Sequence, residues 1–438
     1  MKRGPIRSRA GALTLALGLS FGLPYTPSAD ATGLQTPQTA WPGDLAGVLP
    51  PEEQVRTQLE QLPTIQAAMA GQRVAQGRQA RLEAGPHEWT LRTGAQQRRE
   101  VPGPHYLETE VALERGLRSA GKREADQDLG RNEIELGQLT LADTWHEAAR
   151  ELLRTWFDGL REQQAARVLE SQTQLAQQQL GVIQRRQQAG EAPRLEVLQA
   201  EAELARVQGA WQQAQARARL ARSALQRRYP LLASAEASTR SLPEPAAPTE
   251  TPEARVEHML ADNHEIELAE TQARQAALQA RRVGLEKQGD PVLGVHASRE
   301  RGGQEQVLGV YVSLPLGGAG RLADEQVALA QAEVAEQKLA EVRQRVRSEA
   351  WQVALQAHEA PQAWHSLEAG RQGLEQAAAL ASRAYTLGEL PLGEALQARR
   401  LALEARLAAE AARLDALESE VRLLLDSHEI WTSPEADH

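Results

Sequence analysis

Residues 122–189 form a run of 68 residues without proline, in which the helix-favouring residues Ala, Glu, Gln, Leu and Arg are frequent. A helix of that length would measure about 100 Å, at about 1.5 Å per residue. Only 3% of the 438 residues are aromatic, and the apolar 41% is mostly Ala and Leu. This composition is typical of long helices and coiled coils. We therefore expect one elongated, mainly α-helical molecule with a small β part, rather than a row of compact domains.

A short motif occurs twice along the chain at an offset of 198 residues. Residues 190–200 read GEAPRLEVLQA and residues 388–398 read GELPLGEALQA, with seven of eleven positions identical. Weaker matches relate residues 51–65 to 252–266 and residues 111–122 to 312–321, at nearly the same offset. Matches at a nearly constant offset indicate an internal duplication. Shared Ala, Gln and Glu content would explain similar helices but not the common Gly-Glu-x-Pro.

Both halves have the same predicted order of elements: a half-length helix, two strands, a long helix and a second half-length helix. In the first half these are residues 52–84, about 87–95, about 105–115, 122–189 and 192–229. In the second half they are residues 253–287, about 291–299, about 306–315, 321–387 and 392–430. From the lengths we expect 192–229 to stack on 253–287 along one long helix, and 392–430 to stack on 52–84 along the other.

The two repeats are separated and flanked by segments of different composition. Residues 52–230 form the first repeat and residues 252–430 the second, and the Pro-rich residues 231–251 form a connector without a core of its own. Residues 32–51 are expected to be an N-terminal extension and residues 431–438 a C-terminal tail.

The first 31 residues have the pattern of a secretory signal peptide. Four basic residues up to Arg9 precede an uncharged apolar stretch, residues 10–23, and Ala29-Asp30-Ala31 fits a cleavage site. The alternative is a disordered basic tail. No later stretch is long and apolar enough to cross a bilayer as a helix, so an exported chain that enters a membrane is expected to do so by strands.

The predicted strands alternate between apolar and polar residues. Leu308, Val310 and Val312 share one uncharged face, whereas in residues 105–115 three glutamates alternate with apolar residues: Glu108, Glu110 and Glu114. Strands of about nine to eleven residues with this alternation fit a transmembrane barrel. Open sheet edges are not tolerated in lipid, so three chains would share a 12-stranded barrel, with the three glutamates as candidate lumen residues favouring cations. The alternative is a four-stranded soluble sheet that caps a helical rod.

Charge and motif content exclude several classes of protein. With 49 basic and 59 acidic residues the net charge is −10, which does not favour nucleic-acid binding. The chain has no cysteine, and its ten histidines form no HExxH or similar cluster. No Ser-His-Asp order and no phosphate-binding loop occurs either. We therefore expect no enzyme activity, no catalytic residues, no cofactor and no metal site.

Over roughly residues 50–430 the chain resembles the TolC-like outer-membrane factor family. The resemblance is carried by Gly121-Lys122-Arg123 and by Leu314-Pro315-Leu316 with Gly320-Arg321 after the strand pairs, together with the two Gly-Glu-x-Pro segments. It implies a homotrimer in which an outer-membrane β-barrel continues into a periplasmic α-helical tunnel. The Gly-Lys-Arg segment is most similar to the heavy-metal-efflux, CzcC-like branch. The first repeat departs from the pattern in having Glu114 where the second has Pro315.

The resemblance also implies a function and partners. Such proteins are passive exit ducts of tripartite efflux pumps or type I secretion systems. A periplasmic adaptor, an inner-membrane pump of the RND type and outer-membrane lipid are the expected partners, and heavy-metal cations or small toxic compounds the expected cargo. The alternative is a soluble periplasmic coiled-coil adaptor or scaffold protein.

Two groups of residues are assigned to the periplasmic end by this resemblance. The adaptor-docking turns are Gly190, Glu191, Pro193, Gly388, Glu389 and Pro391, and the alternative is that these residues only form helix turns. The candidate gate consists of Arg185, Arg186, Arg194, Glu196, Arg383, Tyr385 and Glu394, and the alternative is that these are solvated helix faces.

Overall fold

The computed structural model describes residues 45–232 and 242–433, all within one structural unit. The predicted signal peptide, residues 1–31, lies outside the described residues. Most of the N-terminal extension, part of the connector and residues 434–438 also lie outside them.

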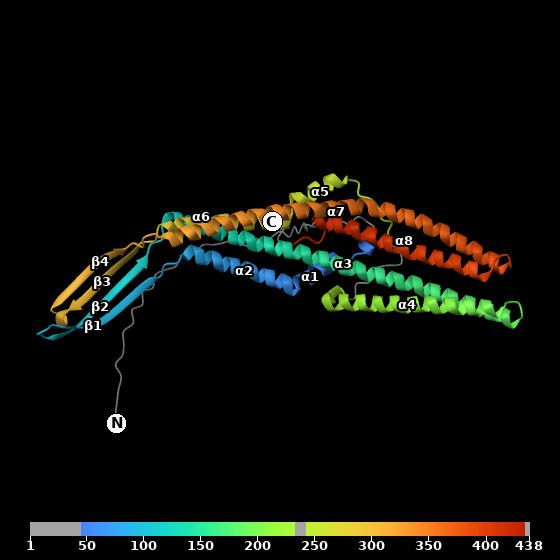
Figure 1. Cartoon of the computed structure of the whole chain (residues 1–438), viewed down its shortest axis with the longest axis horizontal. Coiled ribbons are helices and arrows are strands. Elements are labelled where there is room, and N and C mark those ends of the chain that lie inside the picture. The colour runs from blue at the N-terminus through green and yellow to red at the C-terminus, as the bar shows by residue number, and fades with distance from the viewer. Residues whose placement is uncertain (1–44, 233–241, 434–438) are drawn as a thin grey trace, which may run out of the picture. The chain divides into compact units, whose positions relative to one another are not determined.

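The described residues are mainly helical, with a small antiparallel sheet, as the sequence predicted (Figure 1). The first half contains α1 (Glu52–Glu60), α2 (Pro63–Ala84), β1 (Trp89–Arg99), β2 (His105–Gly116), α3 (Ala120–Gln188) and α4 (Arg194–Arg228). The second half contains α5 (Pro252–Ala261), α6 (His264–Gly284), β3 (Val292–Glu300), β4 (Glu305–Ser313), α7 (Ala319–Thr386) and α8 (Leu392–Asp426). Short 3₁₀ helices are η1 (Leu45–Gly47), η2 (Pro230–Leu232), η3 (Leu285–Lys287) and η4 (Arg301–Gly303).

Two predicted helices are interrupted for local reasons. The range 52–84 is divided into α1 and α2 at Pro63, which has no amide hydrogen and suits the first position of a helix. The range 253–287 is divided at Asn263, whose side chain caps α6 by accepting a hydrogen bond from the Ile266 amide at 3.1 Å. By contrast, α7 continues through the buried Pro361.

Each long helix packs against two shorter ones that follow one another along it (Figure 1). Helices α2 and α4 lie along α3, and α6 and α8 lie along α7. Where α1 approaches the end of α4, the Leu231 amide donates to Gln58 Oε1 at 2.9 Å. The predicted stacks, 192–229 on 253–287 and 392–430 on 52–84, were therefore wrong. Each long helix instead packs with the helices that precede and follow it in the sequence.

Small side chains and a few large ones form the interfaces between helices. Ala149 of α3 and Ala214 of α4 are completely buried, which allows helix axes to approach closely. Two tryptophans of α3 attach the ends of the described chain, because Trp156 Nε1 donates to the Val48 carbonyl at 2.9 Å and Trp145 Nε1 donates to the Trp431 carbonyl at 2.7 Å. These two tryptophans thus anchor both ends of the described chain to α3.

The four strands form one antiparallel sheet in the order β1-β2-β3-β4. Leu91 of β1 lies opposite Leu113 of β2, Val111 opposite Ala297 of β3, and Ala297 opposite Leu308 of β4. The central β2–β3 pairing joins the two halves of the chain, whereas β1 and β4 are edge strands.

A buried lysine holds the start of α3 against the segment that enters β3. Lys122 is 1% exposed, and its Nζ donates to Glu286 Oε2 at 2.9 Å, to the Gln288 carbonyl at 2.8 Å and to Asp290 Oδ1 at 2.9 Å. His87 Nε2 also lies 2.7 Å from Asp290 Oδ2. All three ammonium protons are used, so Lys122 has a structural role at the junction of helices and sheet.

The two carboxylates that accept hydrogen bonds from Lys122 are stabilised in their charged form. Burial alone would raise the pKa of Glu286, but hydrogen bonds from Lys122 and Arg282 outweigh it and lower that pKa. Burial is likewise outweighed at Asp290, where hydrogen bonds from His87 and Lys122 lower the pKa. A lowered pKa means that this stabilisation is present above about pH 4 and is lost as the pH falls further.

Replacing Lys122 by Met should lower the free energy of unfolding by about 3 kcal/mol, because carboxylates are left without their buried partner. The difference from the wild-type protein should shrink as the pH falls below about 4, when the carboxylates become protonated. Chemical denaturation followed by circular dichroism measures both effects. The matched control is Arg123→Gln, next to Lys122 but exposed, which should change stability little. Equal stabilities of the two variants would contradict the assigned role of Lys122.

Candidate functional site

The turns between α3 and α4 and between α7 and α8 have the same backbone structure. Gly190 and Gly388 both have φ +80°, and no atom lies within 4 Å of the position that a Cβ would occupy. The Gly190 amide donates to the Gln187 carbonyl at 3.0 Å and the Gly388 amide to the Tyr385 carbonyl at 3.0 Å. Glycine is favoured here because this way of ending a helix requires a left-handed residue, not because space is short.

The other predicted docking residues complete these two turns. The Glu191 amide donates to the Arg186 carbonyl and the Glu389 amide to the Ala384 carbonyl, each at 2.9 Å, while both glutamate side chains are exposed. Pro193 and Pro391 precede the first residues of α4 and α8. All six predicted residues therefore belong to two matching exposed turns, whose role in adaptor docking remains a prediction.

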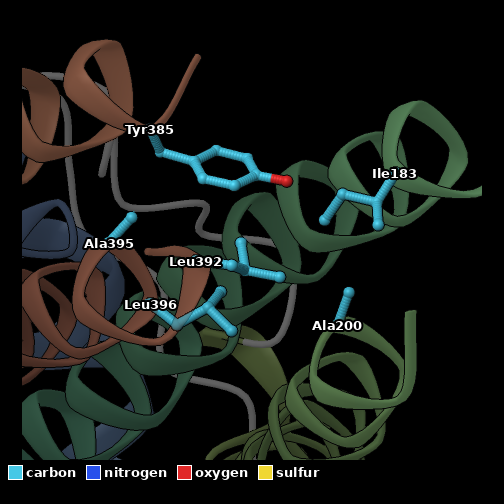
Figure 2. Close-up of a cluster of buried hydrophobic side chains, with 6 residues drawn as sticks. All are labelled: Ile183, Ala200, Tyr385, Leu392, Ala395 and Leu396. Carbon is cyan, nitrogen blue, oxygen red and sulfur yellow. The ribbon is translucent and has the colours of Figure 1, made fainter. Parts of the chain in front are cut away.

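An apolar cluster joins the ends of the two helix pairs near these turns (Figure 2). Its buried members are Ile183, Ala200, Tyr385, Leu392, Ala395 and Leu396, from α3, α4, α7 and α8. In Figure 2 the Tyr385 ring lies above this cluster with its hydroxyl directed toward the α3 side. The cluster therefore fixes the ring while the hydroxyl remains able to make a polar contact.

Three of the seven predicted gate residues meet at this ring. The Tyr385 hydroxyl donates to Glu196 Oε2 at 2.6 Å, and the Arg186 guanidinium carbon lies 5.4 Å from the ring centre. Burial, followed by the hydrogen bond to Glu196, raises the pKa of Tyr385 to about 12. The contact links α7 to α4, so it connects the α7–α8 pair to the α3–α4 pair.

The other four predicted gate residues are not brought into this contact. Arg185, Arg194, Arg383 and Glu394 are exposed. The Arg185 side chain donates only to the Gly181 carbonyl of its own helix, at 3.2 Å. These positions lie on solvated helix faces in the described chain.

Two adjacent arginines that the sequence analysis did not single out make further links between the pairs. Arg400 Nε donates to Glu203 Oε2 of α4 at 2.8 Å. Arg399 donates to Ser382 Oγ of α7 at 2.9 Å and also bonds the Gln179 side chain of α3. Burial lowers the pKa of Arg399, which has no carboxylate partner among the described residues. The two neighbours diverge to different helices, which sequence spacing alone cannot show.

A groove of about 940 Å³ lies among the long helices and their partners. Its lining is dominated by charged side chains: Asp143, Glu147, Arg150, Glu151, Arg154, Asp158, Arg161, Arg228, Glu265, Arg345, Glu349, Asp415, Glu418 and Arg422. Residues of both signs are interspersed, so the groove presents a hydrophilic surface rather than a dry core.

The two faces of the sheet differ in chemical character. One face carries apolar residues that are largely exposed, including Leu91 at 65%, Leu308 at 84% and Val310 at 70%. The other face carries the polar residues, among which Glu108 is 2% exposed. Strands that alternate between an apolar face and a polar face are typical of a transmembrane barrel.

The predicted lumen glutamates lie on this polar face, but two of them are neutralised. Glu108 accepts from Arg98 Nε at 2.9 Å, and Glu114 accepts from Arg92 Nη2 at 2.7 Å and from the Tyr311 hydroxyl. Glu110 is exposed and has no ion pair among the described residues. It is thus the one member of the predicted trio whose charge is uncompensated.

Two further features are absent from the described ranges. No group of three or more His, Asp or Glu side chains in these ranges is arranged to hold a metal ion. No helix within them combines the length and apolar content that a membrane crossing requires.

The long paired helices, the shared sheet and its exposed apolar face define the fold of a TolC-like outer-membrane channel. Neither a protein-family model nor a curated protein matches the sequence. Among solved structures, the CmeC outer-membrane channel of Campylobacter jejuni is 13% identical, with a TM-score of 0.75 over 95% of this chain and 96% of that one. The predicted resemblance is therefore confirmed for the fold.

Two other channels give the same result. The outer-membrane channel OprN is 18% identical, with a TM-score of 0.69 over 86% of this chain and 90% of that one. The MtrE outer-membrane channel of Neisseria gonorrhoeae is 14% identical, with a TM-score of 0.64 over 86% of this chain and 88% of that one. At these identities the similarity shows the fold alone, and the CzcC-like branch stays a prediction.

Replacing Tyr385 by Phe should loosen the end of α7 while keeping the apolar cluster. The lost hydrogen bond to a carboxylate is worth roughly 1.5–3 kcal/mol, so amide protection around residues 380–388 should fall by about tenfold or more. Hydrogen exchange measured by mass spectrometry tests this. Because the raised pKa keeps the hydroxyl protonated, the wild-type contact should persist below about pH 10 and weaken as the pH approaches 12.

The control for this experiment is Arg383→Gln, which changes an exposed side chain two residues from Tyr385. Its exchange should match that of the wild-type protein. If the Phe variant also matched the wild type, the Tyr385–Glu196 contact would not hold the helix ends together.

Proposed function

We propose that this chain is the outer-membrane channel component of a tripartite efflux system and acts as a passive exit duct from the periplasm to the exterior. The observation that carries the proposal is the contrast between the two faces of the sheet. One face is apolar and exposed, and the other carries polar side chains joined by ion pairs. In water such an apolar face would be a liability for aggregation, whereas in lipid it is the favourable arrangement.

Closure of the barrel supports assembly as a homotrimer. The edge strands β1 and β4 leave unpaired backbone groups on both sides of the sheet, and such edges are not tolerated in lipid. Pairing β4 of one copy with β1 of the next satisfies them. Three copies then give twelve strands, an even number wide enough for a lumen.

The helices also present apolar surface that a second copy would cover. Along α7, exposed apolar residues include Leu322, Val327, Leu329 and Val334, all more than half exposed. Three such chains side by side would enclose a helical tunnel, into which the charged groove would place its hydrophilic surface. A polar solute could move along this hydrophilic lining without meeting a dry apolar surface.

The two matching turns and the Tyr385–Glu196 contact support a regulated periplasmic end. The exposed turns around Gly190 and Gly388 are the proposed docking sites of a periplasmic adaptor, which couples the duct to an inner-membrane pump of the RND type. The few polar links between helix pairs are releasable, which suits a gate better than a fully packed core does.

The proposal also includes a cargo, an export signal and two internal repeats. Heavy-metal cations or small toxic compounds are the proposed cargo, in keeping with the similarity of Gly121-Lys122-Arg123 to the CzcC-like branch and with the uncompensated Glu110. Residues 1–31 are the proposed export signal. Residues 52–230 and 252–430 are the proposed repeats, since each contains a strand pair followed by a helix of 69 or 68 residues.

The second candidate is a soluble periplasmic coiled-coil adaptor or scaffold. The long helix pairs are compatible with it, but the exposed apolar face of the sheet opposes it. Extraction distinguishes the two candidates. The duct should be recovered from the membrane fraction only with detergent, as a trimer, whereas a water-soluble monomer from the periplasm would refute the channel.

Cargo is tested by deleting the gene in its host. The deletion strain should become more sensitive to zinc, cobalt or copper, or to common drugs, and plasmid-borne protein should restore growth. Sensitivity to metals alone would support the heavy-metal branch. Sensitivity to drugs alone would assign the duct to small toxic compounds.

Replacing Glu110 by Gln should lower the cation preference of the channel, because the trimer loses three uncompensated carboxylates from its lumen. Reversal potentials in planar bilayers under a salt gradient measure this preference. Glu53→Gln is the control, since it removes an exposed carboxylate from α1, away from the sheet. Unchanged selectivity of the Glu110 variant would place this residue outside the ion path.

A further inference from the structure

The helix α8 ends in the same way as the two turns described above, but with a histidine at the glycine position. The His428 amide donates to the Leu425 carbonyl at 3.1 Å and the Glu429 amide to the Leu424 carbonyl at 2.9 Å. His428 has φ +57°, where Gly190 and Gly388 have φ +80°. A left-handed non-glycine residue is strained by about 1–3 kcal/mol and persists only where its surroundings hold it.

What holds His428 is a cluster of imidazole rings from three parts of the fold. The ring centre of His428 lies 5.1 Å from that of His146 on α3 and 4.6 Å from that of His264 at the start of α6. His146 Nε2 lies 3.2 Å from Asp426 Oδ1, on the last residue of α8. The cluster therefore joins α3, α6 and the end of α8.

The residues that follow α8 are packed tightly, but several of their buried polar atoms lack hydrogen-bond partners. Trp431 is 3% exposed, also has a positive φ, of +51°, and its carbonyl accepts from Trp145 Nε1. Ser427 Oγ, Trp431 Nε1 and Ser433 Oγ are buried without a hydrogen-bond partner among the described residues. Strain and missing hydrogen bonds both lower the free energy needed to release this segment.

We propose that residues 427–433 form an acid-released C-terminal clasp, in which the packed rings of His146, His264 and His428 hold the segment on α3 and α6, and protonation of His146 and His428 releases it. This inference does not depend on the channel function. It concerns a joint at which both halves of the chain meet, far in sequence from the turns at Gly190 and Gly388.

The charges around the cluster set the direction of the effect. Burial, and then the proximity of His146 and His264, lowers the pKa of His428 to about 4. Burial also lowers the pKa of His146, against the opposing hydrogen bond to Asp426. A lowered histidine pKa means that the clasp is fully stable above about pH 6.5 and loses stability as the pH falls toward 4.

Other groups around the rings do not reverse this direction. They are Asp143, Glu147 and Arg150 on α3, Arg255 on α5, Asp262 before α6, Glu267 on α6, Arg422 and Asp426 on α8, and Glu429 in the clasp itself. Asp426 has a strongly lowered pKa and stays charged throughout the window. Burial and the nearby Glu147 raise the pKa of Asp143. Protonation of Asp143 at acid pH therefore stabilises the folded protein and opposes the effect of the histidines.

The test is hydrogen exchange of the amides in residues 427–433, measured on the full chain in detergent at pH 7.5 and at pH 4.5. Protection, corrected for the intrinsic rate at each pH, should fall by about tenfold or more in the wild-type protein at acid pH, within a limit on the order of 100-fold set by the shift of the His428 pKa. Amides in the middle of α3 should keep their protection.

The decisive variant is His428→Gly, which removes the imidazole and suits the positive φ, so the turn itself should survive. Its loss of protection at acid pH should be clearly smaller than that of the wild type, because only His146 then remains as a buried histidine with a lowered pKa. His258→Gln, which alters an exposed histidine of α5, should behave like the wild type.

Three outcomes would overturn the clasp. They are a wild-type segment equally protected at both pH values, a glycine variant that loses protection as much as the wild type, or an equal loss along α3, which would indicate global unfolding.

Discussion

The packing of each long helix against two shorter ones is the constraint on which the rest of the structure depends. A helix of 69 residues cannot bury its surface within one compact core, so α3 is covered by α2 over one part and by α4 over another. Alanines at the interfaces allow this close approach, and the same arrangement recurs at α7. The strand pairs and the tight turns are then placed by where the long helices begin and end.

Local signals in the sequence predicted the elements well. Glycine and proline located the turns after α3 and α7, and alternating residues located all four strands to within a few residues. One boundary failed: the predicted helix 392–430 ends at Asp426 instead. The left-handed residue that ends it is His428, and histidine gives no sequence signal for a position usually filled by glycine.

Contacts between distant parts of the chain were less accessible to sequence reasoning. Arg186, Glu196 and Tyr385 were predicted as gate residues, but their meeting depends on how two helix pairs cross, 189 residues apart in the chain for the hydrogen-bonded pair. The stacking of half-length helices was wrong for the same reason, since length alone does not distinguish between partners. Arg399 and Arg400 look alike in sequence yet bond to different helices.

The proline inside α7 has a mechanical consequence for the helix pairs. Pro361 has no amide hydrogen, so the carbonyl of Ala357 lacks its usual partner within the helix, and the proline ring crowds the preceding turn. Bending at this point breaks one hydrogen bond fewer than bending elsewhere in the 68-residue helix. Pro361 therefore divides α7 into a segment that follows the sheet and a segment that carries Tyr385, joined where the helix has one backbone hydrogen bond fewer.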